Sequence, residues 1–205
     1  MFKAEPARRG SGDERRRAIA EAARDLIIER GFEGLRTRDI AERVGINVAT
    51  LHYHVPSKEA LIGLVAETIR DHFHAQGTRH SRAGANGLKR LRLELADFRE
   101  TLVETPDLVV VFSEMLDRAR RHGAAGDVIT PMYEFWHAQF VSLLALGVAD
   151  GSLRPDLDPP AAADMVTGAL SDFWRRCARD LARYDRMAAE LERSVVNTVS
   201  PPKDT

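Results

Sequence analysis

The stretch that decides the fold covers residues 37–61 and reads TRDIAERVGINVATLHYHVPSKEAL. Its apolar residues recur at the three- and four-residue spacing of a helix, and Gly45 and Pro56 interrupt that spacing. Glycine and proline are the residues that most often end helices. The stretch therefore predicts two short helices, 38–44 and 48–54, joined by a turn of three to four residues, with a further helix after the proline.

Polar residues at the helix ends fit this prediction. Thr37 is a suitable N-cap for the first short helix and Asn47 for the second, because both side chains can accept a hydrogen bond from the first turn. Two such helices joined by a glycine-containing turn form a helix-turn-helix, in which the second helix presents its N-terminal residues to base edges in the major groove of DNA. The side chains expected on its exposed face are small or hydrogen-bonding, and none is acidic: Asn47, Val48, Thr50, His52, Tyr53 and His54.

Residues 37–61 resemble the TetR family of bacterial one-component transcriptional repressors. The resemblance covers about residues 13–65 and is specific there, whereas the rest of the chain agrees in length and helical character only. It implies an all-α fold, with an N-terminal three-helix helix-turn-helix DNA-binding domain and a C-terminal helical bundle for ligand binding and dimerisation. It implies no cofactor.

Carried over residue by residue, the resemblance also implies how this face meets double-stranded operator DNA. Thr37 contacts a phosphate, Thr50 and Tyr53 contact the backbone or base edges, His54 faces the phosphates, and Lys58 anchors the DNA backbone. The full expected set is Arg36, Thr37, Arg38, Asn47, Val48, Ala49, Thr50, His52, Tyr53, His54 and Lys58. Two alternatives stay open: Tyr53 could pack against the first helix, and Lys58 could be a solvated charge at a helix start.

The chain departs from the family pattern at three positions of this motif. His52 stands where family members often have an aromatic residue, so it is a candidate for reading a base. Val55 stands where phenylalanine is usual, which predicts looser packing against the next helix. Asn47 replaces the more common serine, and both residues cap helices well.

Length and composition exclude several other classes of protein. The chain has 205 residues, of which 44% are apolar, enough for a sizeable core in one domain or two small ones. No run approaches the roughly 18–20 apolar residues of a membrane span, and Met1 to Gly12 lacks the apolar run of a secretory signal. A single cysteine, Cys177, excludes an intramolecular disulfide framework and a cysteine-rich zinc module. A cytoplasmic location follows as the default.

The net charge of −1 is an average over two unlike parts. Residues 1–60 carry 12 Lys and Arg against 10 Asp and Glu, whereas residues 61–205 carry 18 against 21. Near the N-terminus the arginines cluster, which suits phosphate or minor-groove contacts but is also typical of a solvated tail: Arg8, Arg9, Arg15, Arg16 and Arg17. Overall neutrality therefore does not exclude DNA, and it predicts weak non-specific binding that relies on a few placed contacts.

Helical periodicity dominates the rest of the chain as well. The first helix is expected from near Ser11, where a capping box begins, to Gly31. Further helices are expected at 57–75, 88–104, 107–122, 127–150, 159–183 and 185–199. The predicted organisation is an N-terminal arm and DNA-binding domain at 1–56, a connecting helix at 57–76, an effector-binding and dimerisation domain at 77–200, and a disordered tail at 201–205.

Large apolar side chains gather in the later helices, and the resemblance implies a pocket between residues 91 and 174 for a partly apolar small-molecule effector. Such sites are concave and mainly apolar, with a few polar anchors. The expected lining is Phe98, Phe112, Met115, Met132, Phe135, Trp136, His137, Phe140, Phe173 and Trp174, and the candidate anchors are His137, Asp172 and Arg175. Each of these residues, taken alone, is better explained as part of an ordinary helical core.

The last two helices are the predicted homodimer interface. Apolar residues recur along them at helical spacing: Ala162, Met165, Val166, Ala169, Leu170, Phe173, Cys177 and Leu181, followed by Leu191, Val195, Thr198 and Val199. Two such helices from each subunit would form a four-helix bundle. Packing of the same stripe inside one chain is the alternative.

No motif for catalysis or for a bound metal emerges from the sequence. His72, His74 and His80 form one histidine cluster, but residues two apart on a helix do not share a face. A glycine-rich phosphate loop and a nucleophile elbow are absent. Cys177 lies on an apolar stripe, as an inert core thiol would. The sequence therefore predicts neither an enzyme nor a metal protein.

The predicted function is that of a ligand-responsive homodimeric repressor. It would bind a palindromic operator through the major groove and be released by a small-molecule effector. Two alternatives remain at this point: an all-helical protein-binding module, and a regulator that needs no ligand or that activates transcription.

Overall fold

A computed structural model describes residues 12–119, 123–177 and 179–196. Within these ranges the chain is α-helical, and its only strand-like feature is an isolated bridge between Leu153 and Val196. The helices are α1 (Gly12–Arg30), α2 (Thr37–Val44), α3 (Val48–His54), α4 (Lys58–Gly77), α5 (Gly87–Glu104), α6 (Pro106–Ala119), α7 (Gly123–Ala149), α8 (Pro159–Cys177) and α9 (Leu181–Val195), and a short 3-10 helix, η1, covers Phe32–Gly34. The all-α fold class predicted from the sequence is confirmed.

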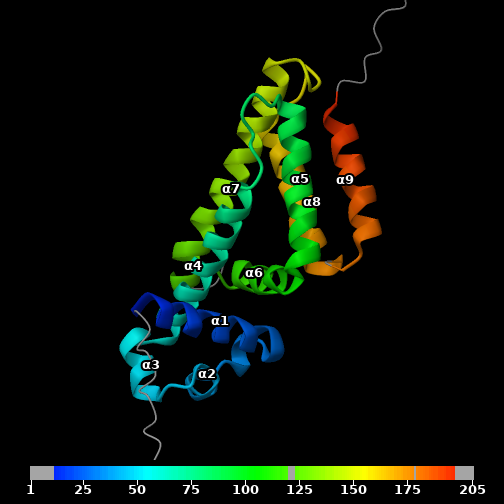
Figure 1. Cartoon of the computed structure of the whole chain (residues 1–205). Helices are drawn as coiled ribbons and strands as arrows, with labels where there is room; N and C mark the ends of the chain where they lie inside the picture. Colours follow the sequence, from blue (N-terminus) through cyan, green and yellow to red (C-terminus); the bar gives the residue numbers. More distant parts are fainter. Residues whose placement is uncertain (1–11, 120–122, 178, 197–205) are drawn as a thin grey trace, which may run out of the picture.

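The molecule has a small head and a larger helical body (Figure 1). Helices α1, α2 and α3 form the head, and α4 leads out of it into the body. In the body α5, α7, α8 and α9 run lengthwise, while α6 lies across the end that faces the head. One core of buried apolar residues extends from the head into the body. No helix in the described ranges is long and apolar enough to cross a membrane.

The head follows the prediction from residues 37–61 closely. Helix α3 has the predicted bounds, and the Asn47 side chain caps it by accepting a hydrogen bond from the Thr50 backbone N–H at 2.7 Å. Gly31 and Gly45 end α1 and α2 with φ of 69° and 71°, in the left-handed region that favours glycine. The apolar face predicted for the first helix is buried: Ile19, Ala22, Ala23, Leu26 and Ile27.

Two details of the head differ from the prediction or lie beyond it. Thr37 is wrong as an N-cap: α2 begins at Thr37 itself, and Arg36 precedes it in extended conformation with no side-chain cap. The reason is that the Ile40 N–H bonds to the Arg36 carbonyl at 3.2 Å, which starts the helix one residue earlier. The capping box predicted for the first helix begins at Ser11, which lies outside the described residues.

In the body the predicted break between the last two helices is misplaced. The expected helix 159–183 ends instead at Cys177, and α9 begins at Leu181. Asp180 sets the new start because its carboxylate accepts a hydrogen bond from the Arg183 backbone N–H at 2.9 Å. The apolar spacing continues across this break, so periodicity alone conceals it. The tail 201–205, with Thr198 and Val199, lies outside the described residues.

The apolar stripe predicted for dimerisation is largely used inside the chain. Four of its members on α8 are buried in the core: Ala162, Val166, Leu170 and Phe173. On α9 Leu191 and Val195 are also buried, and the Tyr184 hydroxyl donates to the Leu95 carbonyl of α5 at 2.6 Å. Met165, at 43% exposure, is the large stripe residue that stays open. Much of the stripe therefore packs inside one chain, as in the alternative, and a dimer interface on the last two helices stays a prediction.

Candidate functional sites

The surface predicted to meet DNA is open on α3. Tyr53 is 84% exposed and its ring meets the neighbouring His54 ring edge-on, so the alternative in which Tyr53 packs against the first helix is wrong. Leu51 and Val55 point the other way and are buried, which holds the helix against the core. The remaining expected residues are exposed or half-buried: Arg36, Thr37, Arg38, Asn47, Val48, Ala49, Thr50, His52, His54 and Lys58.

Charged contacts fix the position of this face within the head. Arg43 on α2 forms two hydrogen bonds of 2.9 Å to the carboxylate of Glu29 on α1, and that guanidinium holds the pKa of Glu29 below its ordinary value. Arg16 on α1 donates to the His54 carbonyl at 3.1 Å, at the C-terminal end of α3. A cation suits that position because the last carbonyls of a helix lack partners. Of the predicted arginine cluster, Arg8 and Arg9 lie outside the described residues.

The head also touches α6 of the body. The Arg118 guanidinium lies 4.9 Å from the centre of the Phe32 ring and 3.1 Å from a carboxylate oxygen of Glu33. The hydrogen bond from Arg118, together with the nearby charge of Lys58, holds the pKa of Glu33 below its ordinary value. These contacts make Arg118 a direct link between the body and the residues that precede α2.

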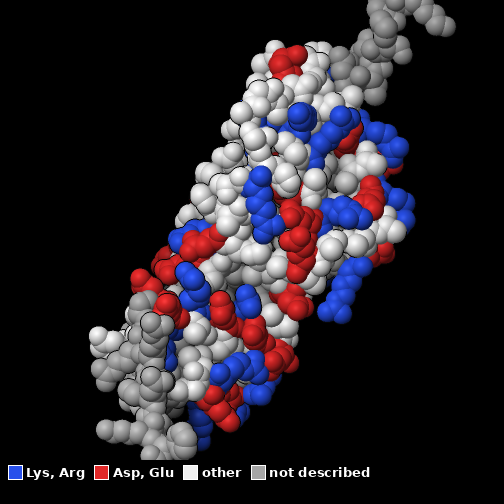
Figure 2. All heavy atoms as spheres, viewed as in Figure 1, with Lys and Arg blue, Asp and Glu red and all other residues white. Residues whose placement is uncertain are grey.

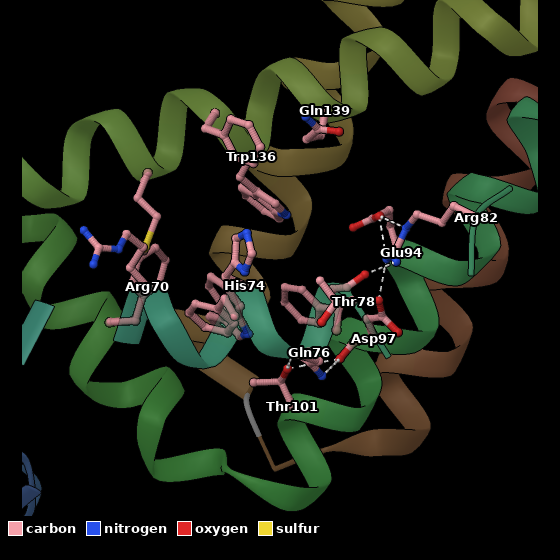
Figure 3. Close-up of a pocket in the computed structure, with 17 residues that line it drawn as sticks. Arg70, His74, Gln76, Thr78, Arg82, Glu94, Asp97, Thr101, Trp136 and Gln139 are labelled. Atoms are coloured by element: carbon pink, nitrogen blue, oxygen red, sulfur yellow. Dashed lines mark hydrogen bonds and ion pairs between the residues drawn. The ribbon is translucent and has the colours of Figure 1, made fainter. Parts of the chain in front are cut away.

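A cavity of about 350 Å³ lies in the body between α4, α5, α6, α7 and α8 (Figure 3). Six of the ten residues predicted to line it do so: Phe98, Phe112, Met132, Phe135, Trp136 and Trp174. Trp174 is the centre of this wall, with the Phe98 ring stacked on it at 4.5 Å and the Trp136 ring nearly parallel at 5.9 Å between centroids. The apolar half of the cavity is therefore largely aromatic.

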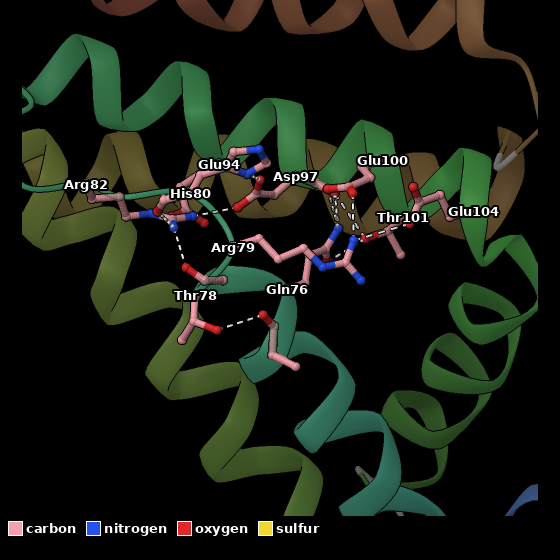
Figure 4. A network of polar contacts seen from close by, with 12 residues as sticks. Gln76, Thr78, Arg79, His80, Arg82, Glu94, Asp97, Glu100, Thr101 and Glu104 are labelled. Carbon is pink, nitrogen blue, oxygen red and sulfur yellow. Dashed lines mark hydrogen bonds and ion pairs between the residues drawn. The ribbon is translucent and has the colours of Figure 1, made fainter.

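The polar half of the cavity lies where α4 and the loop after it meet α5 (Figures 3 and 4). Gln76 is buried; its amide nitrogen donates to the Asp97 carbonyl at 2.7 Å and its oxygen accepts from Thr101 at 2.8 Å. Arg82 donates to Glu94 at 2.9 Å and to Asp97 at 2.6 Å. Burial raises the pKa of Glu94, although the Arg82 guanidinium opposes that shift. This network attaches the end of α4 to α5.

Four predicted lining residues are elsewhere. Met115, Phe140 and Phe173 are at most 4% exposed and belong to the core, because their helices turn these faces toward one another. His137 lies outside the cavity, with Nε2 2.8 Å from Asp164 of α8. Neither of the other two candidate anchors reaches the cavity, since Asp172 pairs with Arg176 and Arg175 pairs with Asp117.

The cavity residues that the sequence does not predict come mainly from the connecting helix 57–76, from the residues that follow it directly and from α5. They are Arg70, Phe73, His74, Gln76, Gly77, Thr78, Arg82, Glu94, Asp97, Thr101 and Gln139. One signal was present: Glu94, Asp97 and Thr101 recur at three- and four-residue spacing, as residues on one face of a helix do. Nothing in the local pattern indicates that residues 76–82 fold back against this face.

Among the described residues, one group has the spacing of a metal site. Single ligand atoms of His80, Asp97 and Glu100 all lie within 4.8 Å of one another. Both carboxylates already bond to guanidinium groups, Asp97 to Arg82 and Glu100 to Arg79 at 2.7 Å. A cation would have to displace these arginines, so the group fits an ion-pair network better than a metal site.

Comparisons with known proteins agree with this architecture. Residues 19–65 match the family model of bacterial regulatory proteins, tetR family. The chain is 30% identical over 152 residues to the HTH-type transcriptional repressor KstR2 of Mycolicibacterium smegmatis, covering 70% of each chain.

Two solved structures share the fold. A TetR-family transcriptional regulator from Rhodococcus sp. superposes with a TM-score of 0.80 at 23% identity, covering 90% of this chain and 100% of that one. A transcriptional regulator from Saccharomonospora viridis, solved in complex with choline, gives a TM-score of 0.80 at 22% identity and covers 90% and 99% of the two chains.

Proposed function

Because this chain belongs to the TetR family of bacterial transcriptional regulators, we propose that it is a homodimeric repressor that a small molecule releases from a palindromic operator. The exposed, acid-free surface of α3 carries the DNA-binding half of this proposal. The aromatic cavity beside α4 carries the effector-binding half. Catalysis has no part in it, and operator DNA gives the protein a cytoplasmic place of action.

In this proposal α3 enters the major groove. Tyr53, His52 and Thr50 reach base edges or the backbone, because each is an exposed or half-buried side chain of α3 that can hydrogen-bond. Lys58, exposed at the start of α4, contacts a phosphate and so sets the register of α3. Two heads would reach successive major grooves about 34–36 Å apart.

The dimer face we propose is the outer side of α7 and α8. Residues 135–149 of α7 contain no Lys, Arg, Asp or Glu, and Figure 2 shows few charges over this helix. Exposed small or apolar residues line the two helices: Ala138, Ala145, Ala161, Met165 and Gly168. Small residues let two helix pairs approach closely, as in a four-helix bundle. Helix α9 is less suited, because Arg92–Glu192 and Arg99–Asp185 ion pairs attach it to α5.

Two helices connect the cavity to the head. Helix α4 contributes Phe73 and Gln76 to the cavity and begins beside α3 at Lys58. Helix α6 contributes Phe112 to the cavity and ends near the Arg118 contact with Phe32 and Glu33. A ligand that changes the position of either helix changes the spacing of the two heads. Coupling of about 1–3 kcal/mol is typical of such allostery.

The DNA-binding half is tested by selecting bound fragments from random DNA with the full chain and then titrating them by gel shift. We expect a palindromic consensus and an affinity that falls steeply with salt, because phosphate contacts release counterions. Failure to bind any fragment at low salt would contradict the proposal. So would binding that is tight but unrelated to sequence.

The dimer is tested by sedimentation of two matched variants. Ala145→Arg places a charge on the proposed face of α7 and is expected to give monomers at micromolar concentration. Ala96→Arg makes the same change at an exposed position of α5 and is expected to remain dimeric. Equal behaviour of the two variants would show that the dimer face lies elsewhere.

A further inference from the structure

The cavity has features that select the charge of its ligand. Aromatic rings form much of its wall: Phe73, Phe98, Phe112, Trp136 and Trp174. The face of an aromatic ring attracts cations, and sites that recognise quaternary ammonium groups are lined by such rings. The volume of about 350 Å³ suits a small organic molecule.

The arginines that line the cavity are already engaged. Arg82 donates through Nε and Nη2 to Glu94 and Asp97, and through Nη1 to the carbonyls of Gly77 and His80. Arg70, at the opposite end in Figure 3, pairs with Asp71 at 2.8 Å. An anionic ligand would have to compete with Glu94 and Asp97 for the guanidinium of Arg82.

The carboxylates, by contrast, are in excess at the polar end. Glu94 and Asp97 share the guanidinium of Arg82, and Asp97 Oδ1 also lies 3.1 Å from His80 Nδ1, so Glu94 has no cation of its own. Arg82 reaches Glu94 through Oε1, and no other described residue bonds to that carboxylate. The Glu94 side chain is 21% exposed, so water compensates it only in part. Burial also raises the pKa of Glu94, as expected of a carboxylate that lacks a full counter-charge.

We propose that the effector is an organic cation, an ammonium group on an apolar body, which lies among the aromatic rings with its charge toward Glu94. This inference rests on the proposed function, since it names the chemical class of ligand for the same cavity. A cation would supply a counter-charge to Glu94, and the half-buried ring of Trp136 would interact with it through its face. A neutral ligand would gain only the apolar contacts.

The chain offers a direct readout of binding. It has two tryptophans, Trp136 and Trp174, and both line the cavity. Intrinsic fluorescence is titrated with benzyltrimethylammonium, with its uncharged carbon isostere 2,2-dimethylpropylbenzene, and with phenylacetate, over the range in which all three dissolve. We expect the cation to bind at least 10-fold more tightly than the isostere, and phenylacetate to bind more weakly still.

Three variants identify the groups responsible. Glu94→Gln is expected to weaken binding of the cation at least 10-fold while changing that of the isostere by less than twofold. Glu134→Gln removes the same charge from an exposed position of α7 and should leave both affinities unchanged. If circular dichroism shows that Glu94→Gln does not fold, Trp136→Leu is the substitute, because it keeps every charge and leaves Trp174 as the reporter. Trp136→Leu should weaken binding of the cation several-fold more than binding of the isostere.

Several results would overturn the inference: equal or tighter binding of the isostere or of phenylacetate, an unchanged cation affinity in Glu94→Gln, or no fluorescence response to any probe. Operator affinity is measured on the same preparations. If the operator is bound while the probes bind in another order, only the class of ligand is wrong. If no preparation binds DNA, the proposed function itself fails.

Discussion

The residues expected to contact DNA lie between Arg36 and Lys58, whereas those that line the cavity are spread from Arg70 to Trp174. In the head, two short helices and their caps place each side chain, so neighbours in sequence are also neighbours in space. In the body, five helices meet around one cavity, and each contributes only a few residues. The DNA-binding surface of the head is therefore formed by residues close together in the sequence, whereas the cavity depends on the packing of long helices against one another.

The largest effect is expected from changing the local surface of the head. Tyr53→Ala combined with Lys58→Ala should lower operator affinity about 100-fold, or about 2.7 kcal/mol, because it removes one contact on α3 and one phosphate contact from each subunit. Binding of the fluorescent probes in the cavity should not change. Fluorescence anisotropy with labelled operator measures the first quantity, and Glu21→Ala, at an exposed position of α1, is the control. An unchanged operator affinity would contradict the assigned contacts.

The second prediction concerns packing in the body. A Cβ atom added at Gly87 at the start of α5 would overlap the backbone of Gly147 in α7, so Gly87→Ala should cost about 1–3 kcal/mol of unfolding free energy. Gly63 lies within α4 with no atom near an added Cβ. Gly63→Ala should therefore stabilise the protein by about 0.5–1 kcal/mol. Urea denaturation of the two variants measures the difference, and opposite signs are the expected result.

The third prediction tests whether the two regions communicate through α6. Arg118→Met removes the ion pair with Glu33 and the cation–π contact with Phe32. We expect little change in operator affinity without ligand, but a decrease of roughly threefold to tenfold in the effect of a bound effector on that affinity. The control is Arg175→Met on α8, which breaks the ion pair with Asp117, the residue before Arg118 on α6. Equal effects of the two variants would argue against a specific role for Arg118.

The smallest expected effect is a pH dependence of cation binding. Because burial raises the pKa of Glu94, this carboxylate takes up a proton at higher pH than an ordinary one as the solution is acidified. The affinity for benzyltrimethylammonium, which does not titrate, should therefore fall roughly twofold or more between pH 7.5 and 5. The other ionisable side chains that line the cavity are His74, Asp97, Arg82 and Arg70. A His74→Gln variant that retains the fall, and a Glu94→Gln variant that loses it, would assign the effect to Glu94.

Stability depends on the protonation of Glu94 in the opposite sense to cation binding. A carboxyl whose pKa is raised on folding holds its proton more tightly in the folded state, so ionised Glu94 lowers stability at neutral pH and this cost disappears on acidification. His72 works in the opposite direction: burial lowers its pKa, so acidification below its ordinary pKa costs stability.

The parts of the fold predicted correctly are those with a local physical cause. Asn47 caps α3, and Gly31 and Gly45 end their helices, because a cap or a positive φ depends on a few consecutive residues. The start of α9 does not follow from periodicity, because the apolar spacing continues past Asp180. The local signal there is the Asp180 carboxylate, which caps the helix. The predicted start of α2 is one residue too late, because a single backbone hydrogen bond, from Ile40 to the Arg36 carbonyl, decides where the helix begins.

By itself the sequence determined the chemistry of the head. The period of the helix predicts that α3 turns Leu51 inward and presents an exposed face without acidic residues. Only the tertiary structure decided which apolar residues line a cavity. Phe98 and Phe173 are similar in type and burial, yet the first lines the cavity and the second does not. Their difference arises from the packing of α5 and α8 against neighbours distant in sequence. A helical period specifies which side of a helix is buried, but not what that side meets.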